Sequence, residues 1–151
     1  MSCFDMIRVT KRVHKGDSEA TLELPLEIRV RARFKANLTD GRDVGVFLDR
    51  GRIIRGGDLL ESEDGIVIQV QSAPEKVSIV RSNDHHLLLR AAYHLGNRHV
   101  LLQVLPGELR YQCDHVLDLM LTGLGIETIY DELPFEPEPG AYGEHGLADV
   151  E

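Results

Sequence analysis

The sequence has few of the features that mark secreted or membrane proteins. It contains only two cysteines, Cys3 and Cys113, which are too few for a disulfide framework. We expect both to be thiols in a reducing compartment. No apolar run approaches the roughly 20 residues that a membrane helix needs. The first residues, MSCFDMIRVTKRVHKG, lack an apolar stretch followed by a small-residue cleavage site. We therefore expect no secretory signal, a cytoplasmic location and no membrane partner.

Aromatic residues and positive charge are also scarce. Tryptophan is absent, aromatic residues make up 5% of the chain, and 17 Lys and Arg face 25 Asp and Glu, for a net charge of -8. Residues 1–75 carry 12 basic against 13 acidic side chains (-1), and residues 76–151 carry 5 against 12 (-7). The second part also holds six of the seven histidines. Such a composition repels phosphates and attracts divalent cations, so we expect no nucleic-acid partner.

The first half of the chain has the pattern of a small all-β domain. Alternating or β-branched runs, separated by turn signals such as Asp40-Gly41 and Asp64-Gly65, predict strands. These runs cover residues 5–10, 20–25, 43–49 and 65–71.

Basic residues recur at every second position in the stretch EIRVRARFKANL. If this stretch is a strand, alternation gathers Arg29, Arg31, Arg33 and Lys35 on one face. Such a face is either simply solvated or a docking surface for an acidic partner. The sequence leaves both interpretations open.

The pattern changes at residues 71–76, QSAPEK, where a proline and small residues predict a domain boundary. Strand and helix patterns alternate beyond it. They comprise a strand over 76–82, a helix from about Asp84 to Gly96, two short strands split by Pro106-Gly107, a helix capped by Asp114, and a strand over 126–133. The order β-α-β-β-α-β is the ferredoxin-like pattern.

The fold class predicted from these patterns is α+β. We expect a β-rich domain over residues 1–73 and a ferredoxin-like domain over residues 76–133. Residues 134–151 contain several prolines and glycines and little apolar content, which predicts a flexible tail.

The segment YHLGNRHVLLQV, residues 93–104, places a histidine on each side of a Gly-Asn-Arg break. The break predicts a helix end, and we expect a strand to start at His99. Alternation then sends Val100, Leu102 and Val104 to the core, and His99 and Leu101 to the opposite face. An apolar side chain on that face indicates a two-fold homodimer in which His99 meets its own copy and two imidazoles form a metal site. The alternative is a hydrogen-bonded structural histidine.

Cys113 and His115 form a second candidate pair around Asp114. In an extended segment, residues two apart point the same way, so thiolate and imidazole can chelate one ion of Zn²⁺, Cu²⁺ or Ni²⁺. The same residues also fit a helix start with a buried thiol. A nucleophile and base pair is a third interpretation, but no oxyanion-hole motif follows and no third group orients the base. We therefore expect no enzyme activity.

Three stretches resemble the urease accessory protein E (UreE) family, the nickel metallochaperones of urease maturation. Two of them are AYHLGNRHVLLQVLPGELRYQCDHVLDLML and LPFEPEPGAYGEHG. The third, DGRDVGVFLDRGRIIRGGDLL, resembles the first domain of the family. The G-N-R-H motif and the P-F-x-P-E-x-G-A-Y stretch are highly specific, and together the stretches cover most of the chain.

The resemblance implies a nickel chaperone with a partner-binding or peptide-binding domain over residues 1–73 and a metal-binding and dimerisation domain over residues 76–133. It also implies a homodimer, with one Ni²⁺ site built from His99 and its mate and with His145 of the tail contributing. Cys113 stands where some members have a histidine beside the Asp-His dipeptide, which implies a secondary site with His115. Zn²⁺ and Cu²⁺ are the expected competitors of Ni²⁺. The implied partners are urease and the urease accessory proteins, including the GTPase component. Many members end in a histidine-rich tail, whereas this chain has only His145, so few ions per dimer are expected.

Two other interpretations compete with a metal carrier. The order β-α-β-β-α-β also describes an RNA-recognition motif, but the corresponding strands offer only Tyr111 for base stacking. The chain could instead be an adaptor whose basic strand docks partners while the histidines are incidental. The adaptor hypothesis predicts that metal has no effect on assembly.

Overall fold

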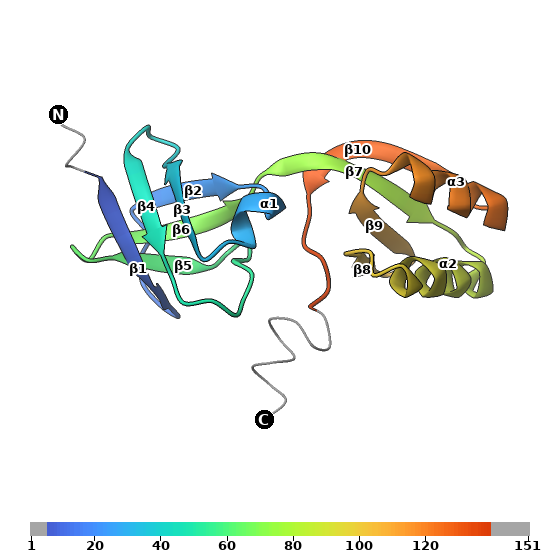
Figure 1. Ribbon diagram of the computed structural model, residues 1–151, viewed down its shortest axis with the longest axis horizontal. Helices are drawn as coiled ribbons and strands as arrows, with labels where there is room; N and C mark the ends of the chain where they lie inside the picture. The colour runs from blue at the N-terminus through green and yellow to red at the C-terminus, as the bar shows by residue number, and fades with distance from the viewer. Residues whose placement is uncertain (1–5, 140–151) are drawn as a thin grey trace, which may run out of the picture. The chain divides into compact units, whose positions relative to one another are not determined.

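The computed structural model describes residues 6–139, which divide into two compact units between Ala73 and Pro74. Each unit has its own sheet and its own cluster of buried apolar side chains. Figure 1 shows one unit made of strands with the short helix α1, and another in which two longer helices accompany a sheet. The predicted α+β fold class is confirmed. Among the described residues, no helix is long and apolar enough to cross a membrane.

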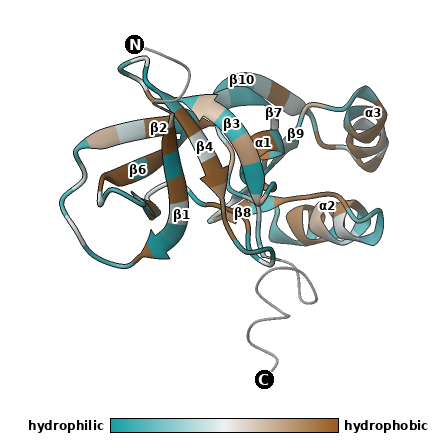
Figure 2. Cartoon of the chain, turned by 60° about the vertical axis from the view of Figure 1, so that its left-hand side comes forward, coloured by the Kyte–Doolittle hydropathy of each residue, from teal (hydrophilic) through white to brown (hydrophobic). Residues whose placement is uncertain are grey.

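The first unit is built on a six-stranded sheet with the order β2-β6-β5-β1-β4-β3. Its strands are β1 (Ile7–Val13), β2 (Ala20–Leu24), β3 (Arg33–Asn37), β4 (Asp43–Phe47), β5 (Leu59–Ser62) and β6 (Val67–Ser72). Strands β1 and β4 pair in parallel, as do β2 and β6, and the other neighbours are antiparallel. The four predicted strands are present, and β3 and β5 are additional ones. Fully buried side chains such as Val46 and Ile68 form the core, and Figure 2 shows hydrophobic residues along β4 and β6.

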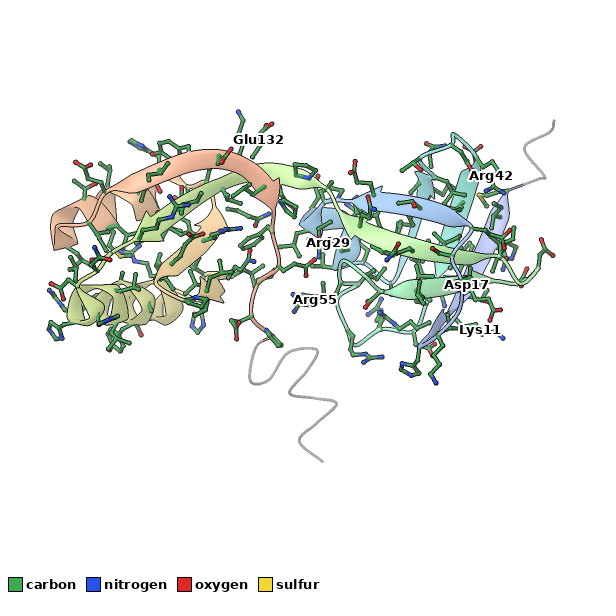
Figure 3. The ribbon with its side chains drawn as sticks, turned by 180° about the vertical axis from the view of Figure 1, so that it is seen from behind. Lys11, Asp17, Arg29, Arg42, Arg55 and Glu132 are labelled. Carbon is green, nitrogen blue, oxygen red and sulfur yellow. The ribbon has the colours of Figure 1, made fainter. Side chains whose placement is uncertain are left out.

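The basic stretch after β2 is not a single strand. Residues Leu26–Arg29 form the short helix α1, and β3 begins only at Arg33. Arg29, the last residue of α1 (labelled in Figure 3), is completely buried. Its Nε donates to the carbonyl oxygen of Leu24 and its Nη1 to that of Ile54, both at 3.1 Å. The prediction that Arg29 belongs to an exposed basic face is therefore wrong, because its guanidinium satisfies buried backbone carbonyls from two other segments.

The second unit is a four-stranded antiparallel sheet with the order β10-β7-β9-β8 and two helices. In chain order its elements are β7 (Pro74–Arg81), α2 (His85–Asn97), β8 (Gln103–Leu105), β9 (Glu108–Gln112), α3 (His115–Leu124) and β10 (Thr128–Pro134). The helices pack against Val80, Leu109 and Tyr111 of the sheet. The ferredoxin-like β-α-β-β-α-β prediction is confirmed.

Both helices of this unit start where the sequence predicts. The side chain of Asp84 accepts a hydrogen bond from the third residue of α2, and that of Asp114 accepts from the backbone of Val116 and Leu117. These carboxylates satisfy backbone donors that have no partner inside a helix. Helix α3 ends at Gly125, whose φ of 97° is the left-handed conformation that glycine adopts most easily.

A buried carboxylate, Asp118 on α3, ties this helix to the sheet. Its Oδ1 accepts hydrogen bonds from Ser78 Oγ at 2.9 Å and from Tyr111 Oη at 2.5 Å, and its Oδ2 accepts one from Tyr130 Oη at 2.7 Å. The three donors lie on β7, β9 and β10. Burial of Tyr111, its hydrogen bond to Asp118 and the negative charge of that carboxylate raise the pKa of Tyr111, because all three disfavour a phenolate.

The chain after β10 stays beside the second unit for several residues. The backbone N–H of Glu136 donates to Gln103 Oε1 at 3.1 Å, and that of Glu138 donates to the carbonyl oxygen of Leu102 at 2.7 Å. The segment predicted to be a flexible tail therefore begins with a stretch anchored near β8. Residues 140–151 lie outside the described part.

Replacing Arg29 with alanine should lower the free energy of unfolding by about 3 kcal/mol, because two buried carbonyl oxygens lose a donor and a cavity remains. Arg31→Ala is the matched control: its side chain is exposed, and we expect a change within about 0.5 kcal/mol. Urea unfolding followed by circular dichroism measures both values. Equal effects of the two substitutions would contradict a stabilising role for the buried guanidinium.

The raised pKa of Tyr111 predicts how stability changes in alkali. A neutral phenol that is favoured in the folded state contributes stability that is complete below the ordinary pKa of 10.0 and is lost as the pH rises above it. Tyr111→Phe should cost about 1 kcal/mol at neutral pH and should flatten the decline between about pH 10 and 11. Urea titrations at several pH values test this, with the exposed Tyr93→Phe as control. An unchanged alkaline decline in Tyr111→Phe would refute the assignment.

Candidate metal centre

His99 lies in the turn that follows α2 rather than at the start of a strand. Helix α2 continues through Gly96 to Asn97, and β8 begins only at Gln103. The predicted helix stop at Gly96 and the predicted strand start at His99 are therefore wrong. His99 has a φ of 60°, and no other non-glycine residue in the described part of the chain has a positive φ.

The backbone around His99 forms a Schellman turn. The N–H of His99 donates to the carbonyl oxygen of Gly96 at 3.0 Å, and the N–H of Val100 donates to that of Leu95 at 3.3 Å. These two hydrogen bonds close the end of α2, and Leu95 and Val100 belong to one apolar cluster. The residue at the position of His99 in such a turn must adopt the left-handed backbone conformation, and it is usually glycine. A side chain with a Cβ costs roughly 1–2 kcal/mol in this conformation.

The turn presents the His99 side chain to solvent. Across residues 6–139, the imidazole makes no hydrogen bond and no ion pair. This observation argues against the interpretation of His99 as a hydrogen-bonded structural histidine. An exposed, unpartnered imidazole held in a strained backbone conformation is typical of a functional position.

Large apolar side chains near His99 in the chain are also exposed. Leu101 is 45% exposed, as predicted for the outward face, and Tyr93 is 66% exposed on the last turns of α2. Val100 and Leu102 pack against the core as predicted. Val104 was expected in the core but is 50% exposed. Strand alternation does not extend back to His99, because β8 begins only at Gln103. Within β8, Val104 faces outward between the half-buried Gln103 and Leu105.

Cys113 and His115 lie on either side of the residue that caps α3. Helix α3 starts at His115, so the helix-start interpretation is confirmed. Both side chains are exposed, so the expectation of a buried thiol is wrong. The Cys113 Sγ lies 3.7 Å from Ser78 Oγ. The carboxylate of Asp114 is occupied by the backbone of α3, which leaves the thiol and the imidazole as the metal-capable groups of this segment.

Within residues 6–139, no three His, Cys, Asp or Glu side chains come close enough together to hold a metal ion. His99 therefore offers one ligand, and Cys113 with His115 offers at most two. His145, the fourth predicted ligand, lies outside the described residues. A complete coordination shell would need ligands from another copy of the chain, from the last residues or from water.

The hydrogen-bonded group behind Cys113 was not predicted from the sequence. Ser78 donates to Asp118 and lies beside the thiol, so the buried carboxylate network reaches the secondary candidate site. A signal was present, because Asp118 directly follows Leu117 and precedes Leu121 by three residues on the apolar face of α3. An acidic residue on such a face indicates a buried carboxylate with hydroxyl or cationic partners.

Comparison with known proteins agrees with this architecture. Residues 7–73 match the family model described as the N-terminal domain of the UreE urease accessory protein, and residues 75–150 match that of its C-terminal domain. The urease accessory protein UreE of Alkalilimnicola ehrlichii is 54% identical over 139 residues, which cover 91% of this chain and 85% of that protein.

Two enterobacterial relatives give the same result. The urease accessory protein UreE of Enterobacter sp. is 54% identical, with 91% of each chain covered. That of Escherichia coli O157:H7 is 49% identical, with 91% of this chain and 90% of the relative covered. Both units, their order along the chain and nearly the whole length are therefore shared, and the chain belongs to the UreE family of urease accessory proteins.

Proposed function

We propose that the protein carries Ni²⁺ to urease during maturation of the urease active site, and that it binds the ion between two copies of its chain. Membership of the UreE family supports a role accessory to urease. The proposed partners are urease and the other urease accessory proteins, including the GTPase component. The protein acts in the cytoplasm as a chaperone of the ion and catalyses no reaction.

The conformation of His99 is the observation that carries this proposal. Glycine would close α2 without strain, yet the position holds an exposed imidazole that has no hydrogen bond among the described residues. A retained strain of roughly 1–2 kcal/mol needs a compensating role. Metal ligation provides one, because neutral imidazole is a good ligand for Ni²⁺.

The exposed apolar side chains near His99 support a homodimer. Leu101 precedes β8 and Val104 lies within it, and Leu89 and Tyr93 lie one turn apart on α2. Covering such side chains stabilises an interface by roughly 25 cal/mol for each Å² of apolar surface removed from water. A two-fold interface places identical residues near each other. Two His99 imidazoles then supply two ligands to a single ion.

The anchored segment after β10 supports a contribution from His145. Glu138 is hydrogen-bonded to Leu102, which is three residues from His99. An extended chain spans at most roughly 3.3–3.6 Å per residue, so the seven residues from Glu138 to His145 can reach about 25 Å. Few imidazoles and a shell completed by water allow binding and also release. Cys113 and His115 form a secondary site for Ni²⁺, Zn²⁺ or Cu²⁺.

The test is a calorimetric titration of Ni²⁺ into wild type and into His99→Ala, with the oligomeric mass measured by light scattering. Wild type should bind one ion per two chains at its tightest site. His99→Ala removes two ligands from the dimer, so affinity should fall by at least about 100-fold, beyond the 10–100-fold loss of an outer-sphere contact.

His94→Ala is the matched control, because it removes a nearby imidazole that lies within α2 and should leave the tight site intact. Unchanged binding in His99→Ala would contradict the proposed ligand and direct attention to Cys113, His115 or the last residues. An absence of binding in wild type would favour the adaptor hypothesis.

A second prediction separates the structural from the chemical role of His99. His99→Gly should raise the free energy of unfolding of the metal-free protein by about 1 kcal/mol, because glycine adopts the left-handed turn without strain. The same change inside the helix, His94→Gly, should lower it. Thermal unfolding in the presence of a chelator measures both. Destabilisation by His99→Gly would mean that the imidazole stabilises the fold and would refute a purely chemical role for His99.

A further inference from the structure

A groove in the first unit is lined by arginines. It has a volume of about 1110 Å³ and lies between two segments, Val30–Arg33 and Leu48–Ile53, that follow α1 and β4. The register of β3 and β4 explains why these segments meet, since the backbone N–H of Leu48 donates to the carbonyl oxygen of Ala32 at the open end of the hairpin. The sequence brings two pairs of alternating basic residues to this place. They are Arg31, Arg33, Arg50 and Arg52.

These four arginines give the groove a strong positive charge. All four side chains are exposed, and within residues 6–139 none of them has an ion pair or a side-chain hydrogen bond. Asp49 is the only acidic residue in the lining, so the groove carries +4 from arginine and -1 from aspartate. Four unpaired guanidinium groups in one groove of a chain with a net charge of -8 favour an anionic ligand.

Several other basic residues of the same unit are paired with carboxylates. Arg8 bonds to Glu63 at 3.1 Å and Arg42 to Asp40 at 2.8 Å. The hydrogen bonds that Arg42 donates to Asp40 lower the pKa of the Asp40 carboxyl, and the positive charge of Arg42 adds to this effect. The groove arginines lack such partners among the described residues, so their carboxylate-binding forks are available to a ligand.

The basic lining extends beyond the main groove. A smaller hollow of about 300 Å³ shares Asp49, Arg50 and Arg52 with it and adds residues of β1, including Lys11 and Arg12. Lys11 pairs with Glu61 and Arg12 with Asp58, so these two cations are partly neutralised. The positively charged surface therefore extends from the open end of the β3–β4 hairpin to residues of β1.

The size and the apolar content of the groove fit a peptide. Its volume exceeds the roughly 300–1,000 Å³ of sites for small ligands. Val30 is 50% exposed in its wall, while Leu48 is buried beneath it. A ligand that combined carboxylates with an apolar side chain could contact both kinds of surface. No aromatic residue lines the groove, which disfavours single-stranded nucleic acid because such ligands stack on aromatic rings.

We propose that this groove binds an acidic, extended peptide segment of a partner protein. Carboxylates of the segment pair with Arg31 and Arg33 on one wall and with Arg50 and Arg52 on the other, while an apolar side chain packs on Val30. This inference goes beyond the proposed nickel site, because it concerns the first unit and uses none of the candidate metal ligands. It assigns the partner-binding role expected for the first domain to a defined surface.

The test is a fluorescence anisotropy titration with a short labelled peptide of alternating glutamate and valine. Wild type should bind it with an affinity that falls as salt is raised. The double variants Arg31→Glu/Arg33→Glu and Arg50→Glu/Arg52→Glu should each weaken binding by about tenfold or more, because they reverse two charges in contact with the peptide. Lys15→Glu/Arg90→Glu carries the same change in net charge outside the groove and should bind like wild type.

Three results would overturn the proposal. They are equal binding by the groove variants and wild type, equal binding of a peptide with glutamine in place of glutamate, and tighter binding of single-stranded oligouridine than of the acidic peptide. Thermal unfolding of each variant shows whether the fold is retained. Nickel titration of the groove variants should match wild type, so a failure of the groove and a failure of the metal site are distinguishable.

Discussion

The end of helix α2 is the constraint on which the proposed metal site depends. Two hydrogen bonds close the helix, and Leu95 and Val100 place the turn against the core of the second unit. The residue between Arg98 and Val100 must then be left-handed and point outward. The fold thus presents one side chain at a fixed place on the surface, and in this chain that side chain is an imidazole. A rigid helix end gives a metal ligand a defined direction that a flexible loop would not give.

Other contacts connect the remaining elements of the second unit. Asp118 joins α3 to three strands through hydroxyl donors, and the β8 edge carries both the exposed Val104 and the segment that contacts Glu138. The two parts of the sequence differ in charge. The part after residue 75 carries -7 and six of the seven histidines, which suits a cation, while the first unit collects unpaired arginines in one groove. The proposed nickel site and the proposed peptide groove are therefore separate surfaces of one chain.

Features set by local interactions were predictable from the sequence. Asp84 and Asp114 mark helix starts because their carboxylates accept hydrogen bonds from the adjacent backbone. Features set by distant contacts were not predictable. The burial of Arg29 depends on the carbonyl of Ile54, and the donors to Asp118 come from three strands. His99 was proposed as a metal ligand from its sequence context. Its left-handed conformation was not predicted, because the helix was expected to end at Gly96 and instead continues to Asn97.

In the proposed site, two chains share one Ni²⁺ ion through His99. Native mass spectrometry of the nickel-loaded protein is the sharpest test, because it counts chains and ions in the same particle. We expect a dimer that carries one tightly held ion in wild type, and a particle without that ion for His99→Ala under the same conditions. Nickel bound to single chains, or one ion for every chain in the dimer, would show that the ion is not shared.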